Sequence, residues 1–295
     1  MEDQEQKAIG FLASAGKKLK KSKRLFSSMF GGGRSKQAEA CDLYVRAANA
    51  FKMAKKWPQA GKAFEEAAQL QLAMGGKKDA ATYYIDAGTS YRKEDPNASV
   101  SAIHKAIEIY TDIGDFSVAA NYHITLAEMY ASELSDTEKA VQNYEQAADY
   151  YKGEESKWLA NDCLLKVAKY SATRENYEKA IEIYEQIATS CMDDSLQRYR
   201  AAGHFFCASI CHMCMDTVNA QVAVKKYEDI CPAFAESSEC KLVKKLLQAV
   251  EDDSIDDYTE SLKESDWIFS VRLEPFLTTL LLRVQKQLDA EPELC

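Results

Sequence analysis

The sequence predicts an all-α protein, an α-solenoid of antiparallel helix hairpins capped by a C-terminal helical bundle. Its 295 residues are 46% hydrophobic but include only 12 Gly and 5 Pro, so residues that break helices are scarce. The second observation is a short pattern in which Ala is followed four residues later by a large apolar residue and three residues after that by a small or apolar one. This pattern returns at steps of about twenty residues.

Each repeat of the pattern predicts one helix and its turn. Spacings of four and three residues place the three side chains on one helix face. A small Ala opposite a large ring lets two helix axes approach closely, so two units form a hairpin of roughly forty residues, as in tetratricopeptide and related arrays. The predicted solenoid runs from about residue 38 to about 230 and contains these triplets: Ala40/Tyr44/Ala47, Ala60/Phe64/Ala67, Ala80/Tyr84/Ala87, Ala120/Ile124/Ala127, Ala140/Tyr144/Ala147, Ala160/Leu164/Val167, Ala180/Tyr184/Ile187 and Ala220/Val224/Tyr227, with slipped versions at Ala102/Ala106/Ile109 and Ala201/Phe205/Ala208.

Three segments are expected. Residues 1–36 form an N-terminal helix and a basic, apolar loop, residues 37–232 the solenoid, and residues 233–295 a C-terminal bundle with an acidic tail that follows Cys231-Pro232. The sequence has no run of 18 apolar residues and no apolar segment after a basic start, so neither a transmembrane span nor a secretory signal is predicted. Nine cysteines, an odd number, are interpreted as buried thiols of a reducing compartment. We therefore expect a cytoplasmic protein.

The two ends of the chain differ in charge. The formal net charge is −9, yet residues 17–36 hold eight basic residues and no acid. From Leu246 to Cys295, twelve Asp or Glu residues stand against four Lys or Arg residues. The basic end should approach anionic surfaces, and the acidic end a basic partner.

The basic segment contains the strongest local signal. Apolar residues at helical spacing predict a first helix over residues 4–21, followed by an apolar cluster and three glycines at 31–33. Bulky apolar tips beside lysines favour insertion into an anionic bilayer. The alternative is a loop that folds back over the first hairpin, whereas a nucleotide-binding loop is rejected because G-x4-G-K-[ST] is absent. The membrane candidates are Lys20, Lys21, Lys23, Arg24, Leu25, Phe26, Met29 and Phe30.

No catalytic motif is found. The sequence lacks H-E-x-x-H, G-x-S-x-G and G-x-G-x-x-G, so we expect no enzymatic activity and no cofactor. One cluster has side chains that zinc could bind, but its spacing matches no closed structural site, and buried thiols are the preferred interpretation. Its members are His204, Cys207, Cys211, His212 and Cys214. The pairs Asp252-Asp253 and Asp256-Asp257 are interpreted as a solvated surface near a helix end.

Two function classes remain from physical chemistry alone. One is a scaffold that grips extended or helical partners on a long curved face, while its loop touches membrane and its acidic end binds a basic partner. The other is a helical-repeat RNA-binding protein. The acidity of the chain beyond residue 36 argues against phosphate binding, so no nucleic-acid partner is expected. Retention on heparin would distinguish the two.

Several segments closely resemble the soluble NSF attachment proteins of the alpha/beta type. They are residues 52–57 (KMAKKW), 106–112 (AIEIYTD), 148–156 (ADYYKGEES), 240–242 (CKL) and 277–283 (LTTLLLR). The resemblance runs nearly end to end. It implies a peripheral membrane adaptor in vesicle trafficking. Several copies would surround a SNARE bundle of syntaxin, SNAP-25-like and synaptobrevin-like helices and recruit the hexameric ATPase N-ethylmaleimide-sensitive factor, which disassembles the bundle.

The resemblance also assigns residues to partners. Asp216, Glu251 and Asp252 fall on acidic positions that face the ATPase, and Leu294 matches the penultimate leucine linked to its stimulation. The apolar residues at 25–30 occupy the family's membrane-attachment loop. Of the basic positions turned toward SNARE bundles, Lys166 remains, with Arg198 and Arg200 added, while other such positions hold Asp115, Asn121, Asp162 and Ala202.

Overall fold

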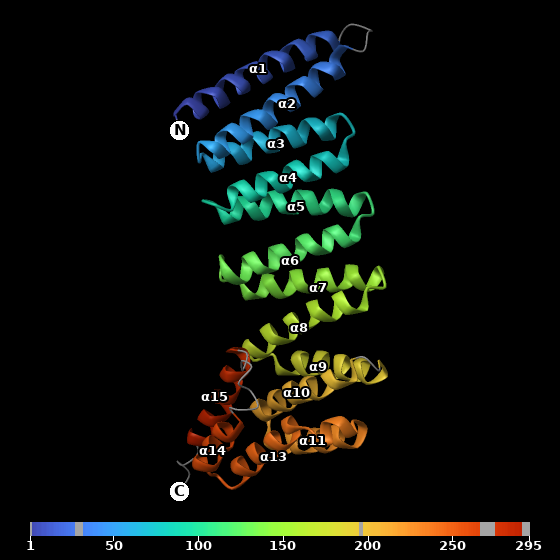
Figure 1. The fold of residues 1–295 in the computed structure, drawn as a ribbon, viewed down its shortest axis with the longest axis vertical. Coiled ribbons are helices and arrows are strands. Elements are labelled where there is room, and N and C mark those ends of the chain that lie inside the picture. The colour runs from blue at the N-terminus through green and yellow to red at the C-terminus, as the bar shows by residue number, and fades with distance from the viewer. Residues whose placement is uncertain (1, 27–31, 195–196, 266–274, 291–295) are drawn as a thin grey trace. The chain divides into compact units, whose positions relative to one another are not determined.

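The protein is described from a computed structural model that covers residues 2–26, 32–194, 197–265 and 275–290, with only the backbone of residues 22–26, 32, 33, 265 and 290. Within these ranges every regular element is helical (Figure 1). The all-α prediction is therefore confirmed. The elements are α1 Glu2–Phe26, α2 Gly32–Met53, α3 Trp57–Ala73, α4 Lys77–Tyr91, α5 Pro96–Asp112, α6 Phe116–Ser132, α7 Thr137–Gly153, α8 Lys157–Thr173, α9 Tyr177–Asp193, the 3-10 helix η1 Arg198–Arg200, α10 Ala201–Met215, α11 Thr217–Ile230, α12 Pro232–Ala235, α13 Ser238–Glu251, α14 Ile255–Ser265 and α15 Pro275–Ala290.

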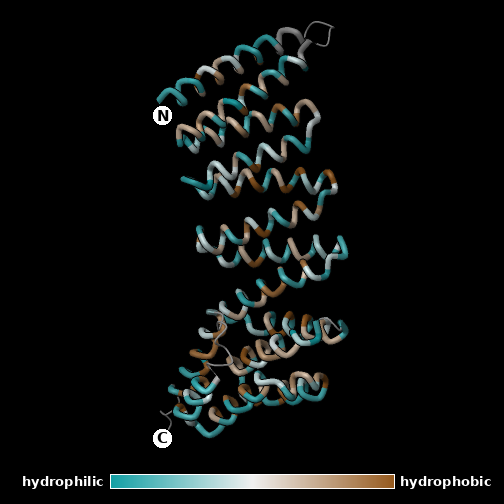
Figure 2. Tube along the Cα trace, viewed as in Figure 1, coloured by the Kyte–Doolittle hydropathy of each residue, from teal (hydrophilic) through white to brown (hydrophobic). Residues whose placement is uncertain are grey.

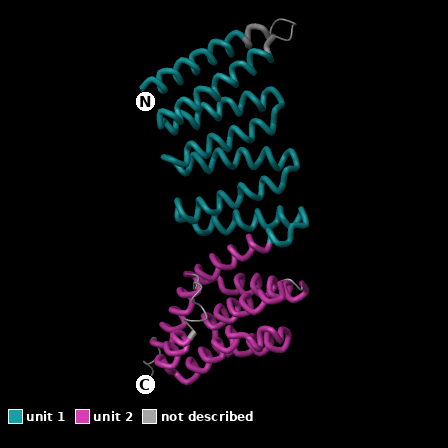
Figure 3. Tube along the Cα trace, in the orientation of Figure 1, with its two compact units in different colours: residues 1–160 teal, residues 161–295 magenta. Residues whose placement is uncertain are grey.

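The chain divides into two compact units, Met1–Ala160 and Asn161–Cys295 (Figure 3). The boundary between them falls within α8. The three segments expected from the sequence divide the chain by function and not by packing, so they stay a prediction.

Unit 1 is a stack of antiparallel helices in which each helix packs against the next one along the chain (Figure 1). The predicted stripe lies inside the stack: Ala60, Phe64 and Ala67 are buried, as are Ala80, Tyr84 and Ala87. Apolar and polar stretches alternate along each helix in Figure 2, as expected when one face of a helix is covered. The small alanines explain the close packing, because they leave room for the rings of neighbouring helices.

The turns repeat as regularly as the helices. Among the described residues, one with left-handed backbone stands two positions before seven of the helices, as at Gly75 (φ 82°) and Gly114 (φ 77°). This conformation ends the preceding helix and suits glycine. Lys55, Ser135 and Glu155 adopt it with a side chain present, so the repeat imposes the conformation even where the sequence lacks glycine.

Unit 2 is built around large side chains rather than an alanine stripe. The rings of Phe205 and Tyr227 lie 4.6 Å apart, and Phe234 of α12 lies 5.8 Å from Phe205. The hydroxyl of Tyr258, on α14, donates to the carbonyl of Leu281 on α15 at 3.0 Å. Helix α10 packs against α9, α11, α12, α13 and α15, which makes it the centre of the unit.

The first helix is longer than the sequence pattern predicts. It extends from Glu2 to Phe26 instead of residues 4–21, so Leu25 and Phe26 are its last two residues and not part of the following loop. Acidic residues in its first turn, Glu2, Asp3 and Glu5, favour the earlier start because they complement the helix dipole. None of the helices in the described ranges is both long and apolar enough to span a membrane.

Candidate functional site

The acidic candidates Asp216 and Glu251 lie at the ends of two helices that pack together. Asp216 is the N-cap of α11, where its carboxylate accepts from the backbone N–H of Val218 at 2.8 Å and from Asn219 Nδ2 at 2.9 Å. Glu251 ends α13, and Gln221 of α11 donates to it at 3.4 Å. Both carboxylates are exposed. The structure thus brings together two of the three acidic residues that the resemblance assigned to the ATPase, and Asp252 directly follows Glu251.

An exposed apolar stripe lies beside these carboxylates. Val218 and Val222 are each 66% exposed, and Met215 is also exposed. Val218 and Val222 lie four residues apart on α11 and therefore share one face of that helix. Met215 is the last residue of α10, and the extended backbone of Asp216 separates it from α11. We define Val218 and Val222 as the α11 stripe. Sequence analysis missed it, although Val218 and Val222 are out of phase with the buried Ala220, Val224 and Tyr227 of the same helix.

More carboxylates follow where α13 ends. Asp252 accepts from Gln248 Nε2 at 3.0 Å, and Asp253 has left-handed backbone (φ 51°). Asp256 and Asp257 lie in the first turn of α14, where they complement its dipole. All four are exposed, which confirms the interpretation of these pairs as a solvated surface. We call Asp216, Glu251, Asp252, Asp253, Asp256 and Asp257 the acidic end of unit 2.

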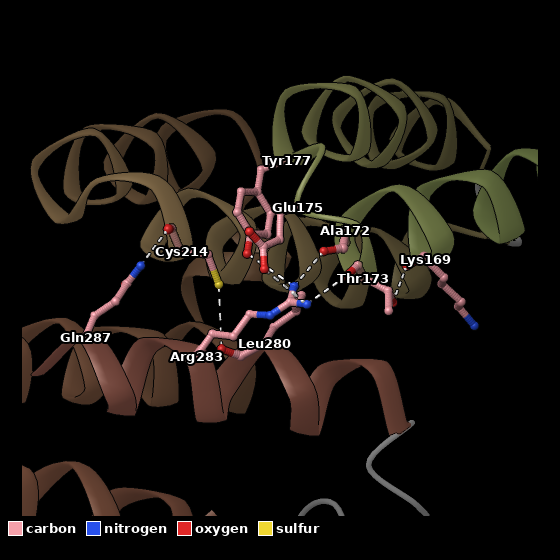
Figure 4. Close-up of polar contacts among 9 residues, drawn as sticks. All are labelled: Lys169, Ala172, Thr173, Glu175, Tyr177, Cys214, Leu280, Arg283 and Gln287. Atoms are coloured by element: carbon pink, nitrogen blue, oxygen red, sulfur yellow. Dashed lines mark hydrogen bonds and ion pairs between the residues drawn. The ribbon is translucent and has the colours of Figure 1, made fainter. Parts of the chain in front are cut away.

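One arginine fastens the C-terminal helix within unit 2 (Figure 4). Arg283 of α15 donates from Nη1 to the carbonyl of Ala172 at 3.0 Å and from Nη2 to that of Thr173 at 2.7 Å. It also donates to the hydroxyl of Tyr177 at 3.2 Å and lies 3.5 Å from the carboxylate of Glu175. The two carbonyls belong to the last turn of α8, where helix carbonyls lack an internal partner and attract cations.

The other contacts of α15 reach α10. Gln287 Nε2 donates to the carbonyl of Cys214 at 3.1 Å, and the Cys214 thiol contacts the carbonyl of Leu280 at 3.6 Å (Figure 4). Cys214 precedes the N-cap Asp216 by two residues, so α15 lies beside the chain that leads into the acidic end. Leu294, the other residue assigned to the ATPase, lies outside the described residues.

The three basic candidates of unit 2 are exposed but differ in setting. Lys166 lies on the surface of α8. Arg198 and Arg200 belong to η1, a short 3-10 turn between α9 and α10. Between them, Tyr199 is 77% exposed. Arg198 Nε donates to the carbonyl of Met192 at 3.3 Å, which holds the turn against the end of α9.

The positions where this sequence lacks an expected basic residue have contacts of their own. Asp115 lies 3.5 Å from Lys78, and Asn121 accepts from the hydroxyl of Tyr151 at 2.9 Å. Asp162 is exposed, whereas Ala202 is buried. Asp115 and Asn121 therefore link neighbouring helices of unit 1, and a lysine at position 202 would need the local packing to change.

Little of the proposed membrane loop can be placed. Lys20 and Lys21 are exposed near the end of α1. Leu25 and Phe26 end that helix, but their side chains and those of Lys23 and Arg24 lie outside the described part, as do Met29 and Phe30.

The His and Cys cluster of α10 is largely internal. Cys211 and Cys214 are buried, as is Cys163 of α8, and Cys207 is half-buried. Burial raises the pKa of the Cys214 thiol to about 11, and burial with nearby Arg200 and Lys169 lowers the pKa of His204 to about 4. Thiols and an imidazole held neutral at pH 7 suit a core. Among the described residues, no three His, Cys, Asp or Glu side chains are grouped so that they could hold a metal ion.

Stacked helix hairpins with charged ends define the chain as a helical-repeat protein. The family model described as "Soluble NSF attachment protein, SNAP" matches residues 6–289. The chain is 54% identical to the human alpha-soluble NSF attachment protein (98% of this chain, 97% of the relative) and 50% identical to the bovine beta form (98% and 96%). It is 33% identical to a probable vesicular-fusion protein, a sec17 homologue of Schizosaccharomyces pombe (90% and 92%). The chain belongs to the soluble NSF attachment protein family.

Proposed function

We propose that this protein is an adaptor that binds post-fusion SNARE bundles and recruits and stimulates the hexameric ATPase N-ethylmaleimide-sensitive factor. The acidic end of unit 2 is the observation that carries the proposal, together with family membership. ATP hydrolysis belongs to the partner, and the adaptor itself performs no catalysis. It works in the cytoplasm and at membrane surfaces, with residues 1–36 toward the membrane, residues 37–232 on the SNARE bundle and the C-terminal segment toward the ATPase.

The ATPase binds the acidic end of unit 2. Six exposed carboxylates attract a basic partner over a distance and accelerate its encounter with this surface. The α11 stripe lies beside them and offers apolar area that a docked partner would remove from water. The proposal is supported by this combination of an apolar patch with a charged rim, which is typical of protein–protein interfaces.

Variants of Asp216 separate binding from folding. Asp216→Asn keeps a good N-cap residue but removes the charge, whereas Asp216→Ala loses both and should cost about 1 kcal/mol of stability. We expect Asp216→Asn combined with Glu251→Gln and Asp252→Asn to leave the melting temperature unchanged and to weaken capture of the ATPase at least severalfold. Unchanged capture by this triple variant at low salt would remove the acidic end from the proposal.

Leu294 acts in the same step. The acids guide the tail toward a basic patch on the ATPase, and the leucine then fills a small apolar pocket there, an effect worth about 1.5 to 3 kcal/mol at most. Leu294→Ala should lower ATPase stimulation by a large factor without changing SNARE binding or thermal stability. Full activity of a chain that ends at Ala290 would show that the tail has no such role.

SNARE binding relies on Lys166, Arg198 and Arg200, because a SNARE bundle is acidic. Single exposed ion pairs contribute only about 0.2 to 1 kcal/mol, so the three must be reversed together. We expect Lys166→Glu with Arg198→Glu and Arg200→Glu to abolish retention on assembled SNARE bundles. Lys226→Glu is the control, because Lys226 is exposed on α11 and already paired with Glu185. Normal retention of the triple variant at low salt would exclude these residues.

Membrane attachment relies on the apolar residues at the end of α1 and in the segment that follows it. Phe26→Ser with Phe30→Ser should weaken binding to vesicles that contain phosphatidylserine and leave the fold intact, as judged by circular dichroism and thermal melting. If this double variant instead lost several degrees of melting temperature and bound vesicles normally, the two rings would belong to the core.

A further inference from the structure

One edge of unit 1 is formed by every second turn of the stack. It contains the end of α1 with the start of α2, and the α3–α4, α5–α6 and α7–α8 turns. Arg34 donates to the carbonyl of Met74 at 2.6 Å, Lys77 pairs with Asp112 at 2.5 Å, and Ser117 donates to Glu154 at 3.1 Å. Each contact joins two consecutive turns of the set, so the four turns form a continuous row. We call this row the loop-side edge, because residues 27–31 follow α1 at its first turn.

Exposed apolar side chains are concentrated on this edge. Leu72 lies in the last turn of α3, Ile113 is the C-cap of α5, Phe116 begins α6, and Trp158 and Leu159 lie in the first turn of α8. All five are exposed, Trp158 most of all at 59%. Elsewhere in the described part of unit 1, only Ile9 and Met53 are exposed large apolar residues. The turns of the opposite edge thus contribute one such side chain, Met53 at the end of α2.

The edge carries lysines that an anionic surface would attract, chiefly at its first turn, although Glu154 and Glu155 are exposed on the α7–α8 turn. Asp112 pairs with Lys77, and Asp115 lies 3.5 Å from Lys78, so two acids on this edge are neutralised by neighbours. Lys157 is exposed directly beside Trp158, and Lys20 and Lys21 are exposed near the end of α1. A lysine next to a large apolar side chain can keep its ammonium group at lipid headgroups while the apolar group sits deeper.

The spacing of the apolar residues argues for lipid rather than for a protein partner. They are spread over three turns, which are joined by an ion pair and a hydrogen bond, whereas a protein interface needs a contiguous patch from which water is excluded. A lipid interface is fluid and accepts apolar tips one by one without shape complementarity. Tryptophan is enriched at that depth because its ring is apolar and its N–H is polar.

We propose that the loop-side edge of unit 1 lies on anionic membranes, with Trp158, Phe116, Ile113 and Leu72 inserted at the interface. The inference rests on the proposed membrane attachment but extends it from one loop to a row of four turns. A membrane contact of this kind would fix how unit 1 is oriented at the bilayer, which a single loop cannot do.

Trp158 allows a direct test. In a variant with Trp57→Phe and Trp267→Phe, Trp158 is the remaining tryptophan. Adding vesicles of phosphatidylcholine and phosphatidylserine should shift its emission to the blue, and brominated lipids should quench it severalfold. The control places the single tryptophan on the opposite edge, with Met53→Trp in a chain that also carries Trp158→Phe, and its emission should not change. Unshifted, unquenched emission from Trp158 on vesicle-bound protein would overturn the proposal.

A vesicle-binding experiment distinguishes attachment through the loop-side edge from attachment through the loop alone. Leu72→Ser with Ile113→Ser and Trp158→Ser should weaken vesicle binding about tenfold, whereas Ile9→Ser with Met53→Ser, the matched control, should not. If the triple variant binds normally and Phe26→Ser with Phe30→Ser does not, the loop alone attaches the protein and the edge proposal is wrong. If the unmodified protein does not bind these vesicles at all, the proposed membrane attachment and the edge proposal are both wrong.

Discussion

Units 1 and 2 contain helices of similar length, but the helices are held together in different ways. In unit 1, each helix packs chiefly on the one before it and the one after it. In unit 2, α10 packs on five other helices, and one arginine of α15 reaches residues that precede it by more than 100 positions. Unit 1 therefore approaches a one-dimensional array, and unit 2 has a single shared core.

The difference predicts how each unit responds to damage. Where helices pack only on their neighbours, the destabilising effect of a substitution stays in adjacent helices, because the stability of such arrays is close to a sum of local terms. In a shared core, the destabilising effect of a substitution reaches all the helices that meet there. The substitutions below probe the packing of each unit, two of them at matched positions in both units.

The largest effect is expected for Phe205→Ala. Phe205 is fully buried against Tyr227 and Phe234, so its loss should cost about 3 to 5 kcal/mol. Amide exchange should accelerate across α10 to α13 and α15. The matched change Phe64→Ala in unit 1 should cost a similar amount but accelerate exchange only from α2 to α5. If accelerated amide exchange extended over equally many helices in the two variants, the contrast between the units would be wrong.

Arg283→Met should follow, at about 2 to 3 kcal/mol, because it leaves two α8 carbonyls without their charged donor. Urea denaturation gives the loss, and limited proteolysis should show early cleavage near α15. Arg283→Lys should recover only part of the stability, since a point charge cannot bridge both carbonyls and Tyr177 as the planar guanidinium does. Full recovery with lysine would mean that charge alone matters here.

A smaller effect is expected from Gly88→Ala in unit 1. The added methyl carbon would lie 2.8 Å from Ile103 Cγ1 and 3.3 Å from the carbonyl of Ser99, so α4 and α5 must separate at a cost of about 1 to 3 kcal/mol. Gly10→Ala is the control, because nothing lies within 4 Å of its added carbon. That change should stabilise the protein by about 0.5 to 1 kcal/mol. Thermal melting should give a lower melting temperature for Gly88→Ala and a higher one for Gly10→Ala.

The smallest effect concerns the turns. Glu155→Gly should stabilise unit 1 by less than about 1 kcal/mol, because glycine relieves the left-handed backbone (φ 57°) but is more flexible when unfolded. Glu175 in unit 2 has the same conformation (φ 66°) but also lies 3.5 Å from Arg283. Glu175→Gly should therefore gain less or lose stability. Equal gains in denaturant titrations would show that the ion pair contributes nothing.

Part of the candidate site could be predicted from the residues themselves, and part only from the family resemblance. The carboxylates at 251–257 are visible as an acidic run, and Asp216 was assigned only by family resemblance. That Asp216 caps α11 and that Gln221 links this helix to Glu251 depends on how α11 and α13 pack. The α11 stripe was missed because exposed apolar residues resemble core residues until the buried face is known.

The sequence by itself determined the helices and the stack of unit 1. Its pattern is local: alanine and aromatic residues three and four positions apart define a buried face, and short turns force each helix against the next. Only the tertiary structure decided the arrangement of unit 2 and the row of turns on the loop-side edge. These features join residues from 35 to more than 100 positions apart, as in Lys77 with Asp112 or Arg283 with Ala172. No local spacing encodes such pairs, because they form only when the packing of whole helices brings their ends together.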